Sequence, residues 1–118
     1  MLAKKYRFHG YGSLKYVFRN GRKARNRYLG LRVTYNPRRE HTRVAVIVSK
    51  KIHKSAVVRN RIRRRIYEVV RHELPRFGGA YDIAITVLSA EVIMTSPVEL
   101  TIDVRRLLAE LGLYESAS

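Results

Sequence analysis

The stretch between residues 42 and 88 most restricts what this chain can fold into. Thr42–Ser49 (TRVAVIVS) and Tyr81–Leu88 (YDIAITVL) are short, β-branched runs of the length of a buried strand. A helical pattern lies between them, at roughly Ser55–Glu73, and Pro75 follows its end. Strand, helix and strand in this order predict a βαβ unit whose two strands pair in parallel. We therefore expect an α+β fold, with helices packed on a single small sheet.

The first third of the chain predicts an arm, a helix and a strand. Residues 1–12 (MLAKKYRFHGYG) are basic and aromatic, which predicts a partly ordered arm and not a signal peptide. Ser13 is suited to cap a short helix that ends at Asn20, because Gly21 follows. A strand around Arg27–Tyr35 then leads into a turn at NPRREH.

The last part of the chain predicts a helix with recognisable ends. Ser96 and Glu99 have capping-box spacing. Pro97 stands at the first helical position, and Gly112 lies where a C-terminal glycine belongs. Its apolar stripe comprises Leu100, Val104, Leu107, Leu108 and Leu111. Because 118 residues suit one core and not two, we expect residues 1–118 to form a single domain.

The central helix is unusually rich in arginine. Its core-facing stripe is expected at Val58, Ile62, Ile66 and Val69. The remaining surface carries one acid, Glu68, against six arginines: Arg59, Arg61, Arg63, Arg64, Arg65 and Arg71. Adjacent like charges weaken an isolated helix, so the arrangement predicts a partner outside the chain.

The charge of the whole chain points to a polyanion as that partner. Lysine and arginine number 25 against 9 acidic residues, which gives a formal charge of +16. The planar guanidinium suits phosphate, and Lys50, Lys51 and Lys54 would enlarge the same surface. The alternative of a solvated charged face predicts acids placed to pair, which are lacking here. An anionic membrane surface is the second candidate, although the longest apolar run, Val44–Val48, is too short for a span.

DNA and RNA are harder to separate from residues alone. A helix that reads the DNA major groove usually belongs to a helical domain with a second packed helix. Here the basic helix belongs to a βαβ unit, which favours RNA. The carboxylates show no metal-ligand spacing, and there are no cysteines, which fits a reducing compartment. Two of the four histidines could in principle provide metal-free acid/base cleavage, but solvated or phosphate-contacting roles are simpler for each of the four.

The segment SKKIHKSAVVRNRIRRRIYEVVR resembles the protein subunit of bacterial ribonuclease P. That family has a VSKK-type strand end and then RNRIKRxIRE at the start of a long helix. The matching residues here are Val48, Ser49, Lys50, Lys51, Arg59, Asn60, Arg61, Ile62, Arg63, Arg64 and Ile66. The first helix is also similar, at Val17, Phe18, Arg19 and Gly21, although Leu14 stands where the family often has an aromatic residue.

The resemblance implies a particular fold. The expected order is α-β-β-β-α-β-α, similar to the second domain of a small-subunit ribosomal protein, with a left-handed βαβ crossover. General handedness rules would predict a right-handed crossover, so this expectation rests on the family.

The resemblance also implies a function. In that family an RNA uses Mg²⁺ to remove the 5′ leader from precursor tRNA, so Mg²⁺ is expected to be held mainly by the RNA partner. The protein would have no catalytic or metal-binding residue of its own and would act in the cytoplasm, without a membrane or an obligatory protein partner. Contacts to the catalytic RNA are implied for Lys50, Lys51, Lys54, Arg59, Asn60, Arg61, Arg63, Arg64 and Arg65. Contacts to the single-stranded leader are implied for Leu14, Lys15 and Phe18.

Alternatives stay open at this stage. Phe18 could instead be a plain core residue, and the basic arm could be a disordered tail. A ribosomal or ribosome-assembly protein could carry a similar basic α+β fold, and an independent nuclease would cleave RNA without an RNA cofactor.

Overall fold

The computed structural model describes residues 11–115, with side chains described from Leu14 onward. Along the chain the elements are α1 (Tyr11–Asn20), β1 (Arg22–Arg25), β2 (Leu29–Tyr35), β3 (Arg43–Ile47), α2 (Ala56–Glu73), the 3₁₀ helix η2 (Leu74–Arg76), β4 (Tyr81–Val87), the 3₁₀ helix η3 (Ala90–Met94) and α3 (Pro97–Glu110). The α-helices and strands follow the expected order α-β-β-β-α-β-α. No helix within this range is both long and apolar enough to cross a membrane.

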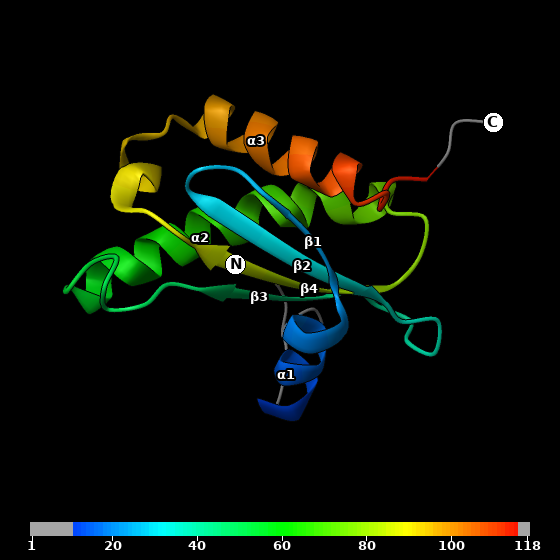
Figure 1. Ribbon diagram of the computed structural model, residues 1–118. Helices are drawn as coiled ribbons and strands as arrows, with labels where there is room; N and C mark the ends of the chain where they lie inside the picture. The colour runs from blue at the N-terminus through cyan, green and yellow to red at the C-terminus, as the bar shows by residue number, and fades with distance from the viewer. Residues whose placement is uncertain (1–10, 116–118) are drawn as a thin grey trace.

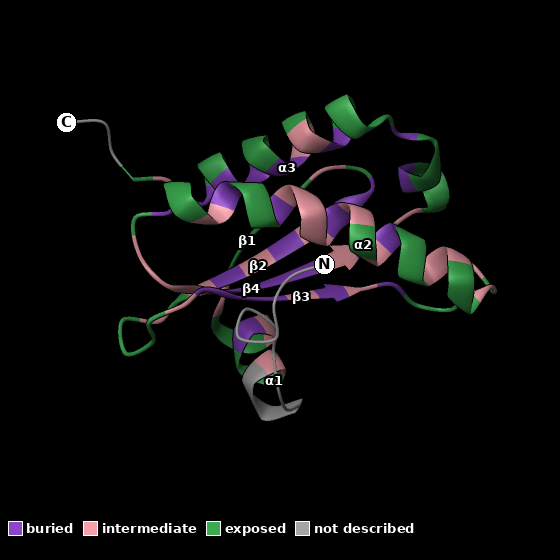
Figure 2. Cartoon of the chain, turned by 180° about the vertical axis from the view of Figure 1, so that it is seen from behind, coloured by how far each residue is buried: buried purple, intermediate pink, exposed green. Residues whose placement is uncertain are grey.

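The four strands form one mixed sheet in the order β1-β2-β4-β3. β2 pairs antiparallel with β1 and with β4. β3 and β4 pair in parallel, with Val44 opposite Ile83 and Val46 opposite Ile85, which confirms the predicted βαβ unit. In Figures 1 and 2 the crossover from β3 through α2 to β4 has the left-handed sense.

The main core lies between the sheet and the two long helices. α2 and α3 lie side by side over the same face of the sheet (Figure 1), and their inner sides are buried (Figure 2). β2 alternates accordingly: Leu29, Leu31 and Val33 are buried in this core, whereas Gly30 and Arg32 point to the opposite face. On that opposite face α1 contacts β2 and β4, and its Val17 is fully buried. The sheet therefore has one covered face and one face that α1 leaves partly open.

The two long helices begin and end as their residue patterns predict. Ser55 caps α2, and its hydroxyl accepts a hydrogen bond from the Val58 amide. Ser96 caps α3 in the same way, with Glu99 as the donor and Pro97 at the first position. Gly112 has φ 74°, a left-handed conformation that favours glycine after a helix.

Two local predictions were wrong, and one was incomplete. α1 begins at Tyr11, so Ser13 lies inside the helix; serine is tolerated there when its neighbours continue the helix. The predicted stripe of α2 does face the core, with Val58 and Val69 half-buried against it, but the prediction missed the fully buried Val70. The strand expected from residue 27 begins at Leu29, because the Asn26 side chain accepts hydrogen bonds from the Tyr28 and Leu29 amides and closes a turn. That turn joins β2 to β1, an edge strand that the residue pattern had not indicated separately.

Candidate nucleic-acid interface

The arginine-rich helix α2 presents two kinds of guanidinium group. Arg59, Arg63 and Arg65 are half-buried and donate hydrogen bonds to backbone carbonyls. Arg59 Nη1 lies 2.9 Å from the carbonyl oxygens of His53 and Lys54, which holds the loop before α2. A carbonyl oxygen neutralises no charge, so these arginines brace the structure and still contribute a positive field.

The other two bracing arginines reach opposite sides of α2. Arg63 donates to the Val48 carbonyl at 3.4 Å and to the Asn60 side chain at 2.5 Å. Arg65 reaches η3, where it donates to the carbonyls of Val92 and Thr95 at 3.3 and 2.5 Å. The arginine-rich helix is therefore tied to the residue that follows β3 on one flank and to η3 and its C-cap on the other.

The second kind of cation is exposed and presented to solvent. Within residues 11–115, no hydrogen bond or ion pair is formed by the charged groups of Lys50, Lys51, Lys54, Arg61 and Arg64. We call this set, together with the three bracing arginines and Asn60, the α2 surface. It contains every residue for which the sequence predicted a contact to a catalytic RNA.

Carboxylates do not neutralise the α2 surface. The acid of α2, Glu68, binds Arg71 instead, with Oε atoms 2.5 and 3.2 Å from the guanidinium nitrogens. This hydrogen bond lowers the pKa of Glu68 to about 2. The buried carboxylates of Glu73 and Asp82 are likewise bound to arginines outside the α2 surface, Arg76, Arg105 and Arg43. The excess positive charge of α2 thus faces outward.

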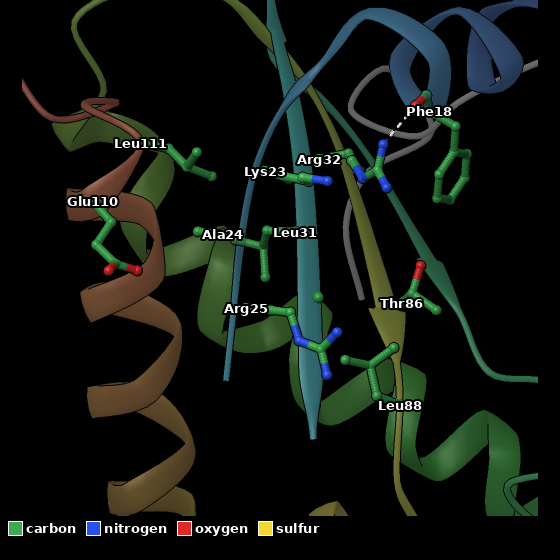
Figure 3. A pocket seen from close by; sticks show the side chains of 11 residues that line it. Phe18, Lys23, Ala24, Arg25, Leu31, Arg32, Thr86, Leu88, Glu110 and Leu111 are labelled. Atoms are coloured by element: carbon green, nitrogen blue, oxygen red, sulfur yellow. Dashed lines mark hydrogen bonds between the residues drawn. The ribbon is translucent and has the colours of Figure 1, made fainter. Parts of the chain in front are cut away.

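A groove opens on the side of the sheet that carries α1. It encloses about 690 Å³ and extends around the edge strand β1 toward the end of α3 (Figure 3). Its lining residues are Phe18, Lys23, Ala24, Arg25, Gly30, Leu31, Arg32, Thr86, Leu88, Glu110 and Leu111. Gly30 has no side chain and Thr86 has a small one, so space is left above β2 and β4. The lysine and arginine side chains of the lining supply positive charge.

Phe18 is the aromatic residue of this groove. It is half-buried, so it is not a plain core residue. The Arg32 guanidinium donates to the Phe18 carbonyl at 2.7 Å and lies 6.0 Å from the centre of the Phe18 ring, beside which Figure 3 shows it. An aromatic face next to a guanidinium suits a stacked, unpaired base.

The groove matches only part of the predicted leader-binding set. Phe18 lines it, whereas Leu14 and Lys15 lie elsewhere on α1 and are not among its lining residues. Sequence reasoning missed Lys23, Arg25 and Arg32. The alternation in β1 and β2 could have found them, because Lys23 pairs with Arg32 and Arg25 pairs with Gly30 across the two strands.

The described residues offer no metal site of their own. No group of three or more histidine, aspartate or glutamate side chains among them could hold a metal ion. The α2 surface consists mainly of cations, and the groove combines cations and one aromatic ring with leucines, small residues and Glu110.

The fold and these two surfaces define a small, basic α+β protein that binds RNA. The family model described as Ribonuclease P matches residues 2–112. The ribonuclease P protein component of Synechocystis is 33% identical over 87 residues, which cover 74% of this chain and 70% of the relative. That of Chloroflexus aurantiacus is 34% identical over 109 residues, which cover 92% and 79%. The chain belongs to the ribonuclease P protein family.

Solved structures agree with the fold. The ribonuclease P protein of Staphylococcus aureus superposes with a TM-score of 0.81 at 22% identity, over 93% of this chain and 98% of that one. The Thermotoga maritima protein, solved in complex with a fluorophenyl thiourea, gives a TM-score of 0.70 at 22% identity, over 87% and 94%. The alternative of a ribosomal or ribosome-assembly protein is not favoured by these comparisons.

Proposed function

We propose that the protein, as the ribonuclease P protein component, uses two separate surfaces to help a catalytic RNA remove the 5′ leader from precursor tRNA. The observation that carries this proposal is the α2 surface. Among residues 11–115 its exposed cations have no carboxylate partner, and the buried acids Glu73 and Asp82 bind arginines elsewhere. Such a surface is favourable only against a dense array of phosphates.

The α2 surface is assigned to the catalytic RNA. Its five exposed cations could each neutralise one phosphate. Counterion release then gives a plot of log K against log salt with a slope of roughly −4. The bracing arginines hold the loop before α2 and η3 in place, so the backbone that carries the exposed cations is already ordered before RNA arrives. Pre-organisation of this kind lowers the entropy lost on binding.

The groove is assigned to the single-stranded leader of precursor tRNA. Arg25, Arg32 and Lys23 follow the phosphates, and Phe18 stacks on one base. No donor or acceptor set in the lining is arranged to select a base, and stacking accepts any base. Leaders of varied sequence would therefore bind with similar affinity.

The chemistry of cleavage is assigned to the RNA and its Mg²⁺. Among residues 11–115 the protein supplies no metal-ligand cluster, so the RNA would hold the ions. The formal charge of +16 helps by drawing RNA phosphates together, which lowers the Mg²⁺ concentration needed for assembly. A cytoplasmic location, where precursor tRNA is made, belongs to the same proposal.

Reconstitution tests the proposed function. Purified protein, a bacterial ribonuclease P RNA and precursor tRNA are combined at low Mg²⁺, and the products are separated on a gel. We expect the protein alone to leave the substrate intact and the protein with RNA to release a mature 5′ end. Cleavage by the protein alone would show an independent nuclease. Co-sedimentation with ribosomal subunits but no stimulation of the RNA would show a ribosomal role.

A further inference from the structure

A group of large apolar side chains lies exposed on η3 and on the first half of α3. Met94 is 87% exposed, Val98 68% and Ile102 48%, and Ile93 adjoins them. The buried stripe of α3 runs through Leu100 and the residues that follow it at helical spacing, so Val98 and Ile102 are left outside the core. Monomeric proteins rarely expose neighbouring apolar side chains of this size without a binding role.

Beside these side chains lies a hollow lined by acids. It encloses about 440 Å³ between the β1–β2 turn, η3 and α3, and Met94 and Ile102 form part of its wall. Its three acids are Glu91, Glu99 and Asp103. Glu91 binds Arg27 at 3.2 Å, whereas the carboxylates of Glu99 and Asp103 form no hydrogen bond or ion pair within residues 11–115. A negative site on a chain of charge +16 needs an explanation.

A buried tyrosine also lines the hollow. Tyr28 is only 6% exposed, and its Oη has no hydrogen-bond partner among the described residues. Tyr28 lines the hollow together with the acids. This oxygen is closed to solvent, so an occupant of the hollow meets other atoms of Tyr28.

The form of the site indicates which cation it takes. The three carboxylates do not converge tightly enough to hold a metal ion. They are spread around an apolar wall, which fits an extended cation with several N–H donors. A guanidinium group can donate to Glu99 and Asp103, and its methylene stem can lie against Met94.

We propose that this hollow and the apolar side chains around it form a docking surface for a protein segment that presents an arginine or lysine between apolar side chains. RNA does not fit, because the acids repel phosphate. A small free polyamine would fill the hollow but would leave Val98 and Ile93 uncovered. Only a protein segment accounts for the charge and the exposed apolar side chains together.

The test uses the full chain and two short fluorescent peptides. One peptide carries an arginine between leucines; the other carries citrulline, which has the same shape and no charge. Fluorescence anisotropy should show saturable one-to-one binding of the arginine peptide and about tenfold weaker binding of the citrulline peptide. Non-specific attraction adds little, because a chain of charge +16 repels a cationic peptide elsewhere.

Variants of the protein locate the binding. Glu99→Gln/Asp103→Asn should weaken binding of the arginine peptide about tenfold, and Val98→Ser should weaken it several-fold. Glu40→Gln/Glu115→Gln removes the same number of exposed charges elsewhere and should have no effect. The proposal is overturned by equal binding of the two peptides, by an absence of saturable binding, or by equal effects of the two double variants. It is also overturned if spermidine binds as tightly as the arginine peptide, which would define a small-polycation site.

Discussion

Phe18 is the single side chain on which leader binding should depend most. Phe18→Ala removes a stacking surface and should reduce the affinity for precursor tRNA by about 1–3 kcal/mol. Mature tRNA, which lacks the leader, should bind the variant and wild-type holoenzymes alike. Tyr16→Ala is the matched control, because Tyr16 is an exposed aromatic on α1 that does not line the groove. An equal loss for precursor and mature tRNA would contradict a leader contact.

Glu73 is the residue that joins the ends of α2 and α3 to the last described residues. Its side chain is 1% exposed and accepts hydrogen bonds from Arg76 at 3.2 Å, Arg105 at 3.0 Å and the Tyr114 hydroxyl at 2.7 Å. Burial, together with the hydrogen bond to Glu73, raises the pKa of Tyr114. The carboxylate thus joins the end of α2 and η2 to α3 and to Tyr114, which come much later in the sequence.

Loss of that carboxylate should be costly. Glu73→Ala leaves two guanidinium groups and a phenol without their partner, and we expect it to lower the free energy of unfolding by about 2–3 kcal/mol. Tyr114→Phe removes only one donor and should lower it by about 1 kcal/mol. Urea denaturation followed by circular dichroism measures both values. A Glu73→Ala variant as stable as the wild type would show that the network adds nothing to stability.

Glu68 should make the stability of the fold depend on pH in the acid range. Its pKa is lowered from 4.5 to about 2 by the hydrogen bond from Arg71, with a further contribution from the charges of Arg71 and His72. Because the folded-state pKa lies below the unfolded one, the stabilisation is full above about pH 4.5 and is lost as the pH falls toward 2. The difference in thermal midpoint between the wild type and Glu68→Gln should therefore shrink over this range. A constant difference from pH 6 to pH 2 would contradict the lowered pKa.

At the scale of an element, substitutions of the exposed and of the bracing arginines on α2 should have different effects. Arg61→Ala/Arg64→Ala removes exposed cations, so it should weaken RNA binding and make the salt slope about 1.5 less negative, with little change in thermal midpoint. Arg59→Ala/Arg65→Ala removes the bonds to the loop and η3, and should cost about 1–2 kcal/mol of stability. Filter binding at several salt concentrations and thermal melts measure the two effects. Similar losses of stability in both pairs would contradict the division.

The helices show how much of an element the sequence can define. Ser55, Ser96, Pro97 and Gly112 act through bonds within one or two turns, so the limits of α2 and α3 were predictable from local patterns. The prediction of which α2 residues are buried was less accurate. Val69 and Val70 are adjacent valines, so only their contacts with neighbouring elements decide which of the two is buried.

The groove was harder to predict than the α2 surface. β1 is the four-residue edge strand RKAR, and it exists because β2 pairs with it, not because of its own β-propensity. The exposed basic composition of Lys23 and Arg25 resembles that of a linker. The residues of α2 lie together on one helix, whereas those of the groove come from separate elements, which only the register of the sheet brings together.

At the scale of the whole molecule, the two surfaces should fail independently. Lys23→Ala/Arg25→Ala changes the groove and leaves α2 intact, so the variant should still bind the catalytic RNA but should lose the advantage of a precursor over mature tRNA. Arg61→Ala/Arg64→Ala should weaken binding of the catalytic RNA. Any holoenzyme that does assemble should still prefer precursor tRNA to mature tRNA. Each pair removes two exposed cations, so the two variants control for each other in net charge. Affinity for the RNA and the ratio of precursor to mature tRNA affinity, measured at one salt concentration, separate the outcomes. If both pairs reduced both quantities equally, the protein would act through its total charge, and the division into two surfaces would be wrong.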